Sequence, residues 1–160
     1  MSLLEDMLDR QRPWDDPDDV LRAARFYLHD QIKVLEAAVE VLDHKEPIEC
    51  VDCVGPGDFV ARSYWRVPSS SKQGGLNPEW YTCMETGCTC VRYIELARAV
   101  DPSMTPMCKH LIAVRLATAL KLVKYTRANA EDFSEALAQA VISTVKMSSR
   151  KESPQPGFRM

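Results

Sequence analysis

The chain has 160 residues, of which 46% are hydrophobic, and this size and composition suit one globular domain with a core of its own. Its 20 basic and 23 acidic side chains give a net charge of -3, which excludes a strong overall attraction to nucleic acid. Residues 1–19 lack the basic start and apolar stretch of a signal peptide, and no apolar run reaches the roughly 20 residues of a membrane span. We therefore expect a soluble protein without a membrane partner.

The first predicted element is a helix over residues 16–46, preceded by a flexible acidic segment at 1–15. Asp16 is a suitable N-cap and Pro17 a suitable first helical residue, because the carboxylate accepts free backbone N–H groups and proline loses no hydrogen bond there. We expect the apolar stripe of this helix to pack on the chain's own core; a partner helix is the alternative, but four heptads make a short coiled coil. The stripe consists of leucines seven residues apart: Leu21, Leu28, Leu35 and Leu42.

A domain over residues 47–127 follows, and its first half has the composition of β-strands. Residues 48–54, 59–67 and 80–84 are rich in β-branched and aromatic side chains and are separated by turn-forming sequences. They predict a small antiparallel three-stranded sheet, which together with the helices makes an α+β fold. Strands this short do not form a stable domain alone, so a helix or a metal ion has to supplement them.

The six cysteines are better explained by metal binding than by disulfides, because the chain shows no export signal and three of them cluster with a histidine. Thiolates and imidazole are the ligands that tetrahedral zinc prefers, so the cluster predicts one Cys3His zinc site. Its four ligands come as two close pairs, CTC and CKH: Cys88, Cys90, Cys108 and His110. In an extended segment, side chains two residues apart face the same way, which lets the first pair converge on one ion.

The CKH pair requires the start of a helix. Residues two apart in a regular helix point about 200° from each other, so Cys108 has to lie close to the helix start and His110 has to reach back from the first turn. Thr105 and Pro106 are a suitable N-cap and first residue for that helix.

We expect the helix to continue through the most basic part of the chain, since residues 102–130 contain no acidic side chain. On a helical wheel, four cations fall within one third of the circumference: Lys109, Lys121, Lys124 and Arg127. Such a stripe either contacts the phosphates of single-stranded DNA or is a solvated face that balances the acidic N-terminal helix. The second interpretation is favoured, because this stretch has too few aromatic residues for base stacking, Tyr125 alone.

The remaining cysteines and histidines have less specific signals. Cys50 and Cys53 have CxxC spacing but lie in a predicted strand, where positions three apart face opposite sides, so we interpret them as strand residues. Cys83 is interpreted as a core residue, because four ligands already complete the zinc site. His29 and His44 lie on or just past the N-terminal helix without a second ligand nearby, which indicates surface or capping roles.

The last predicted element is a helix over residues 128–148, with Asn129 and Asp132 placed as a capping box. Residues 149–160 have the proline, serine and charge content of a disordered tail.

The CxC and CxH pairs resemble the SWIM zinc finger. Over roughly residues 18–145, the chain is similar to one subgroup, the SWIM-domain subunits of the Shu complex, through the YTC strand ending at Cys83 and the CKHLIAV run at 108–114. The resemblance implies a nuclear, non-catalytic adaptor that binds an ATPase-like paralogue of the RecA-family recombinase. It also implies a role in homologous recombination and DNA repair, by promotion of recombinase filaments on single-stranded DNA.

The residues themselves favour a protein that is not an enzyme. Four protein ligands close the coordination sphere of zinc, whereas a catalytic zinc keeps a position for water or substrate. The GPGD sequence at 55–58 lacks the lysine and following helix of a phosphate-binding loop. Two alternatives stay open: a stand-alone SWIM finger that binds DNA directly, and a ubiquitin-transfer protein with a second zinc held by the other three cysteines.

Overall fold

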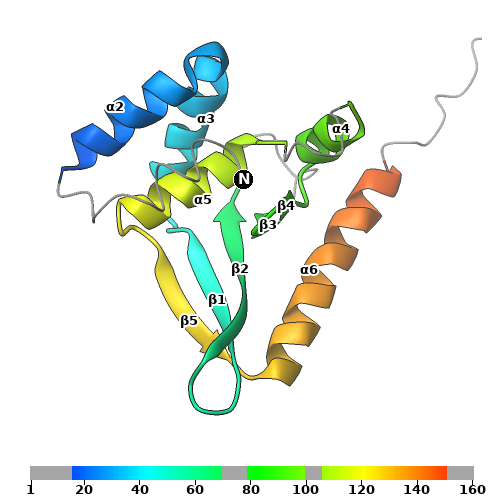
Figure 1. The fold of residues 1–160 in the computed structure, drawn as a ribbon. Coiled ribbons are helices and arrows are strands. Elements are labelled where there is room, and N and C mark those ends of the chain that lie inside the picture. The colour runs from blue at the N-terminus through cyan, green and yellow to red at the C-terminus, as the bar shows by residue number, and fades with distance from the viewer. Residues whose placement is uncertain (1–15, 70–78, 100–105, 151–160) are drawn as a thin grey trace, which may run out of the picture.

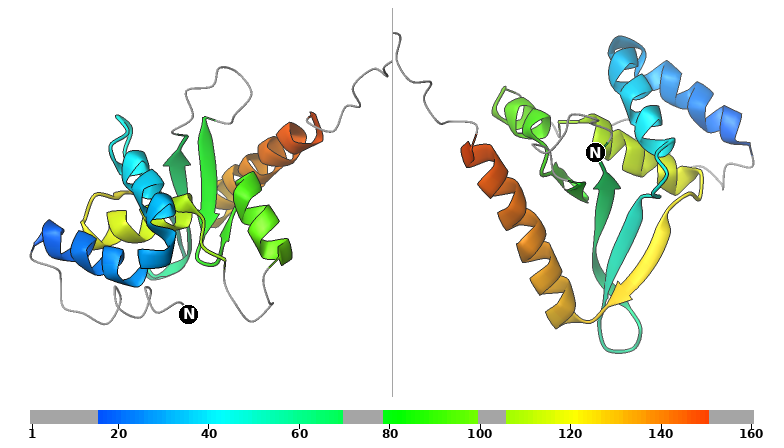
Figure 2. Two further views of the ribbon diagram at one scale, coloured as in Figure 1. Left: turned by 90° about the horizontal axis from the view of Figure 1, so that it is seen from above. Right: turned by 180° about the vertical axis from the view of Figure 1, so that it is seen from behind.

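The computed structural model of the protein describes residues 16–69, 79–99 and 106–150, and the predicted acidic segment at 1–15 and most of the predicted tail lie outside these ranges. The architecture is α+β, as predicted, with a central sheet and helices on both of its faces. Three helices (α2, α3 and α5) cover one face, while the long C-terminal helix α6 runs diagonally across the other (Figures 1 and 2).

The sheet has five strands in the order β4-β3-β2-β1-β5 rather than the three that were predicted. The predicted antiparallel meander is confirmed, because β1, β2 and β3 pair in sequence order. The strands of the whole sheet are β1 (Glu49–Val54), β2 (Val60–Pro68), β3 (Trp80–Met84), β4 (Gly87–Cys88) and β5 (Lys124–Ala128). β4 extends the antiparallel part at one edge, and β5 pairs in parallel with β1 at the other. The sheet is therefore mixed.

The predicted continuous helix through the basic stretch is wrong. The helix α5 (Lys109–Ala119) ends at Leu120, and Lys121 adopts a positive φ of 57°, a left-handed conformation that turns the chain out of the helix. Lys124 then donates its backbone N–H to the carbonyl of Ile48 at 2.9 Å, which starts the parallel strand β5. Tertiary pairing with β1 decides the conformation of these residues.

Because α5 ends after Ala119, the four cations do not form the predicted basic stripe along one helix. Lys109 lies in the first turn of α5 and Lys121 in the turn after it, whereas Lys124 and Arg127 lie on β5. Residues three apart on a strand face opposite sides of the sheet, so the last two cations do not share a surface. Lys124 also forms an ion pair with Glu49 at 3.3 Å.

Glu49 is the centre of a polar network that joins three strands. Lys124 of β5 and Arg66 of β2 each lie 3.3 Å from its carboxylate, and the Thr126 hydroxyl donates to it at 2.9 Å. Burial acts to raise the pKa of Glu49, but the hydrogen bonds from Thr126 and Lys124 and the charges of Lys124 and Arg66 outweigh it and lower that pKa. The Arg66 guanidinium in turn lies 4.8 Å from the ring centroid of Trp80, which extends the network to β3.

The predicted N-terminal helix is divided in two. The helix α2 (Pro17–Tyr27) begins as predicted, with the Asp16 side chain accepting the N–H of Asp18 at 2.9 Å. It ends at Leu28, a short 3-10 turn follows at His29–Gln31, and α3 (Ile32–Leu42) leaves in a new direction (Figure 1). Leu28 and Leu35 are both buried in the chain's own core, as predicted. The bend between the two helices therefore does not prevent their apolar residues from packing on one core.

Two hydrophobic clusters hold the layers together. The larger one lies between the sheet and the helices α2, α3 and α5, and Ile112 and Leu116 of α5 are completely buried within it. The smaller one joins β1 and β2 to α6 (Ala130–Arg150) through Tyr64 and Phe133, whose rings meet edge to face at 5.1 Å. The predicted cap of α6 is confirmed, because Asn129 accepts the N–H of Asp132 at 2.9 Å.

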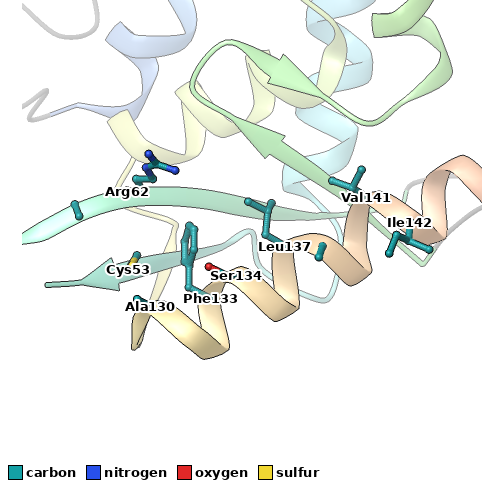
Figure 3. A pocket seen from close by; sticks show the side chains of 10 residues that line it. Cys53, Arg62, Ala130, Phe133, Ser134, Leu137, Val141 and Ile142 are labelled. Carbon is teal, nitrogen blue, oxygen red and sulfur yellow. The ribbon is translucent and has the colours of Figure 1, made fainter.

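The C-terminal helix is longer than predicted, since it reaches Arg150, and its middle borders a groove. The groove encloses about 630 Å³ between α6 and β2 and is lined mainly by apolar side chains, with Phe133 and Leu137 at its inner wall and Ile142 farther along α6 (Figure 3).

Candidate metal centre

Three elements of secondary structure meet at the predicted zinc ligands. Cys88 ends the short strand β4, and Cys90 lies just before the helix α4 (Val91–Ala99), which was not predicted. Cys108 precedes α5, and His110 lies in the first turn of that helix. Residues far apart in the sequence are therefore brought to the place where the sheet edge meets the helical layer.

These four side chains lie close enough together to bind one metal ion. Their ligand atoms all lie within 4.8 Å of one another, and all four residues are buried. The Nδ1 atom of His110 lies 3.8 Å from Cys88 Sγ. Zinc–sulfur and zinc–nitrogen bonds of about 2.3 and 2.0 Å place two tetrahedral ligands about 3.5 to 3.8 Å apart. The predicted ligand set is therefore assembled as a possible metal site.

Backbone N–H groups stabilise negative charge on the first pair of sulfurs. The N–H of Cys90 donates to Cys88 Sγ at 3.5 Å, and the N–H of Tyr93 donates to Cys90 Sγ at 3.3 Å. The second of these bonds has the form of a helix N-cap, with a sulfur in place of an oxygen. The donor and the positive end of α4 thus favour the thiolate form of Cys90, and one backbone donor also reaches Cys88.

Cys108 and His110 point to the same site although residues two apart in a helix diverge by about 200°. The helix start that allows this differs from the predicted one. Cys108 is itself the N-cap of α5, with extended backbone angles (φ -93°, ψ 166°). Thr105 lies outside the described residues, and Pro106 lies before the helix rather than at its first position. An extended residue followed by the first helical turn lets the Cys108 sulfur and the His110 ring face the same point.

The imidazole of His110 is buried, with only 3% of the residue exposed, and stacks on the Tyr81 ring at a centroid distance of 4.3 Å. Among the described residues, its Nε2 atom has no hydrogen-bond partner. An unpaired buried polar group costs about 1 to 3 kcal/mol. An ion bound at Nδ1 would leave Nε2 unpaired, so the metal site is inferred from the convergence of Nδ1 with three buried thiols and not from Nε2.

The proton affinities of the sulfurs differ strongly across the cluster. Hydrogen bonds from Cys108 and Cys88 hold the pKa of Cys90 far below its ordinary value, against the opposing effect of burial. Hydrogen bonding to Cys88 and Cys90, together with burial, raises the pKa of Cys108. Three adjacent sulfurs in one buried site thus share a small number of protons, and a metal ion would replace those protons with positive charge of its own.

The other cysteines and histidines lie outside this group of four. Cys50 and Cys53 face opposite sides of the sheet, as predicted: the Cys50 thiol donates to Asp52, while Cys53 packs in the cluster of Phe133. His29 and His44 are exposed at helix ends. Burial raises the pKa of the Cys50 thiol to about 12, with a further contribution from Asp52, so this sulfur is held as a neutral thiol.

Sequence reasoning placed Cys83 near the site without predicting its contact with a proposed ligand, and it missed Tyr81. Cys83 is completely buried, as predicted for a core residue, but its sulfur lies 3.6 Å from Cys88 Sγ. Tyr81 covers the ligand imidazole. Both belong to the YTC strand, and the signal that finds them is the alternation of a β-strand, which places residues 81 and 83 on one face next to the CTC pair.

In the described ranges, no helix combines the length and hydropathy needed to cross a membrane. Comparisons with protein-family models, with curated proteins and with solved structures find no match to this chain.

Proposed function

We propose that the chain binds one zinc ion through Cys88, Cys90, Cys108 and His110 and that the ion has a structural role. The observation that carries the proposal is the convergence of these four buried side chains within 4.8 Å. Three thiolates and an imidazole are a ligand set typical of structural zinc, whereas magnesium and calcium prefer oxygen ligands. Four protein ligands complete the tetrahedron and leave no position for substrate, which supports a non-catalytic protein.

We infer further that the zinc-stabilised domain is an adaptor of the SWIM type, with a Shu-like role in homologous recombination. The support is the resemblance of the CxC and CxH pairs and of the YTC strand, together with their convergence around one site. In this proposal, the chain works in the nucleus and binds an ATPase-like paralogue of the RecA-family recombinase. Any nucleotide hydrolysis belongs to that partner.

A protein partner is also supported by an exposed apolar surface at the turn between α2 and α3. Phe26 is 74% exposed, and its ring contacts that of Tyr27 edge to face at 5.3 Å. Ile32 is exposed nearby, at the start of α3. Exposed aromatic side chains are typical anchors of protein–protein interfaces.

The proposal is tested by metal analysis and partner capture with matched variants. The purified chain is expected to contain one zinc ion, and Cys108→Ala and His110→Ala are expected to lose it and to stop capturing the partner from nuclear extract. Cys53→Ala and His44→Ala are the controls, because these residues lie outside the group of four ligands. If Cys108→Ala kept a full zinc equivalent, the assignment of ligands would be wrong.

Direct DNA binding is the second candidate, because Lys121 and Arg127 are exposed cations, whereas Lys124 is paired with Glu49. It predicts salt-dependent binding of single-stranded DNA by the chain alone, weakened in a variant that neutralises Lys121 and Arg127. The scattering of these cations makes it the weaker candidate. The ubiquitin-transfer alternative needs a second zinc, and the opposite orientations of Cys50 and Cys53 argue against it.

A further inference from the structure

A fourth sulfur, that of Cys83, lies beside the four proposed ligands. Cys83 in β3 is the direct cross-strand partner of Cys88 in β4, and its thiol donates to Cys88 Sγ at 3.6 Å. Directly paired residues of an antiparallel ladder have their side chains on the same face, so the sheet itself directs Cys83 towards the ligand. The backbone pairing makes this contact a fixed part of the β3–β4 hairpin.

A donor at this position has a clear electrostatic use. Three thiolates and a neutral imidazole around a divalent ion leave one net negative charge on a buried site. Such a charge is unfavourable in a core unless donors compensate it. Cys88 receives the backbone N–H of Cys90 at 3.5 Å, and the thiol of Cys83 adds a second donor from the opposite strand.

We propose that Cys83 is a positioning residue for the metal centre: its S–H group holds the Cys88 thiolate in place and stabilises the negative charge of the site, without binding the ion. This inference depends on the zinc centre proposed above. Hydrogen-bonding partners of metal ligands typically contribute about 10- to 100-fold to metal affinity. Cys83 thereby connects the metal to β3 and through it to the rest of the sheet.

The competing interpretation, a cysteine that only fills the core, predicts the opposite order of two substitutions. If Cys83 only fills space, Cys83→Ser should be worse than Cys83→Ala, because serine buries a hydroxyl group that has no partner. If Cys83 is a donor to Cys88, Cys83→Ser should retain metal better than Cys83→Ala, because its hydroxyl can still donate. The matched control is Cys50→Ala, since Cys50 is also a buried thiol that donates a hydrogen bond, but to Asp52.

The experiment measures the transfer of zinc from each full-length protein to a chelator and the absorption spectrum of each cobalt-substituted protein. We expect Cys83→Ala to release zinc about tenfold faster than the original chain, Cys83→Ser to lie between the two, and Cys50→Ala to match the original chain. The thiolate-to-cobalt bands should shift in Cys83→Ala and keep the intensity of three thiolate ligands. This shift reports on the electronic environment of the Cys88 thiolate. If Cys83 only filled the core, the position of the bands would not change.

Three results would overturn the inference. Equal release rates in Cys83→Ala and Cys50→Ala, or slower release in Cys83→Ala than in Cys83→Ser, would leave Cys83 as a core residue only. Loss of one thiolate's share of the cobalt band intensity in Cys83→Ala would make Cys83 a ligand. If the original chain bound neither zinc nor cobalt, the proposed metal centre itself would be wrong, and Cys83 would have no site to position.

Discussion

Removal of the metal should unfold one part of the chain and leave the rest folded. The segment at greatest risk is β4 with α4, because β4 pairs with β3 at only two positions and α4 has no buried residue. An isolated nine-residue helix is marginal in water, since helices shorter than about 12 to 15 residues rarely form alone. Without the ion, the remaining contacts are few, and they include two hydrogen bonds between Thr82 and Thr89 and the partial packing of Tyr93 on the main core.

The size of the expected effect follows from comparing the free energy of zinc binding with the stability of a whole domain. Structural zinc contributes about 10 to 16 kcal/mol in small peptides, more than the roughly 5 kcal/mol of a marginally stable domain. With the ion bound, α4 should therefore open only when the whole domain unfolds; without it, opening should cost far less, because only the few contacts of Thr89 and Tyr93 remain. A loss of about 5 kcal/mol corresponds to an increase in amide hydrogen exchange of at least about 1,000-fold.

Hydrogen exchange with mass spectrometry, before and after chelation, tests this prediction. Peptides covering residues 87–99 should lose their protection, whereas those covering α6 should keep it, because Phe133 and Leu137 pack on β1 and β2 away from the metal. α5 should loosen only at its first turn, since Ile112 and Leu116 are buried in the main core. Unchanged protection of α4 after verified metal loss would refute the reasoning.

Three further predictions concern the rest of the fold. Phe133→Ala should destabilise the protein by about 3 to 5 kcal/mol in chemical denaturation, because it removes a buried ring, whereas Ile142→Ala, at a 51% exposed position, should change stability by less than about 0.5 kcal/mol. Asn129→Ala should cost about 1 kcal/mol in the same assay, through loss of the cap of α6. Glu49→Gln should flatten the acid limb of the stability-against-pH curve: the lowered pKa of Glu49 stabilises the fold above the ordinary carboxyl range, and this stability is lost as pH falls through the lowered pKa.

Local signals were sufficient for several elements of this fold. The strands β1 to β3, the caps at Asp16 and Asn129, and the four converging ligands each have a signature within a few neighbouring residues. The fold class follows from the alternation of such signatures. The cysteine pairs were predictive because metal coordination demands convergence, wherever the connecting chain runs.

Three features depend on contacts that local signals do not report. The segment 124–128 carries lysine and arginine, which suit a helix surface, yet it forms a strand because β1 offers a free edge in parallel register. The break at Leu28 keeps residues on both sides of it in one core, while periodicity alone allowed a straight helix. α4 has no buried residue and only Tyr93 of this helix packs partly on the main core, so we expect the proposed metal site beside it to stabilise it.

The position of the proposed metal site makes it possible to distinguish two candidate partner surfaces by experiment. The exposed pair Phe26 and Tyr27 belongs to the helical layer, which packs on α5 and the main core and should persist without metal. A partner that docks on β4 and α4 loses its surface with the ion. Partner capture by the chelated chain therefore distinguishes them: retained capture, abolished by Phe26→Ala, places the partner on the α2–α3 turn. Loss of capture on chelation, together with normal capture by Phe26→Ala, places it beside the metal.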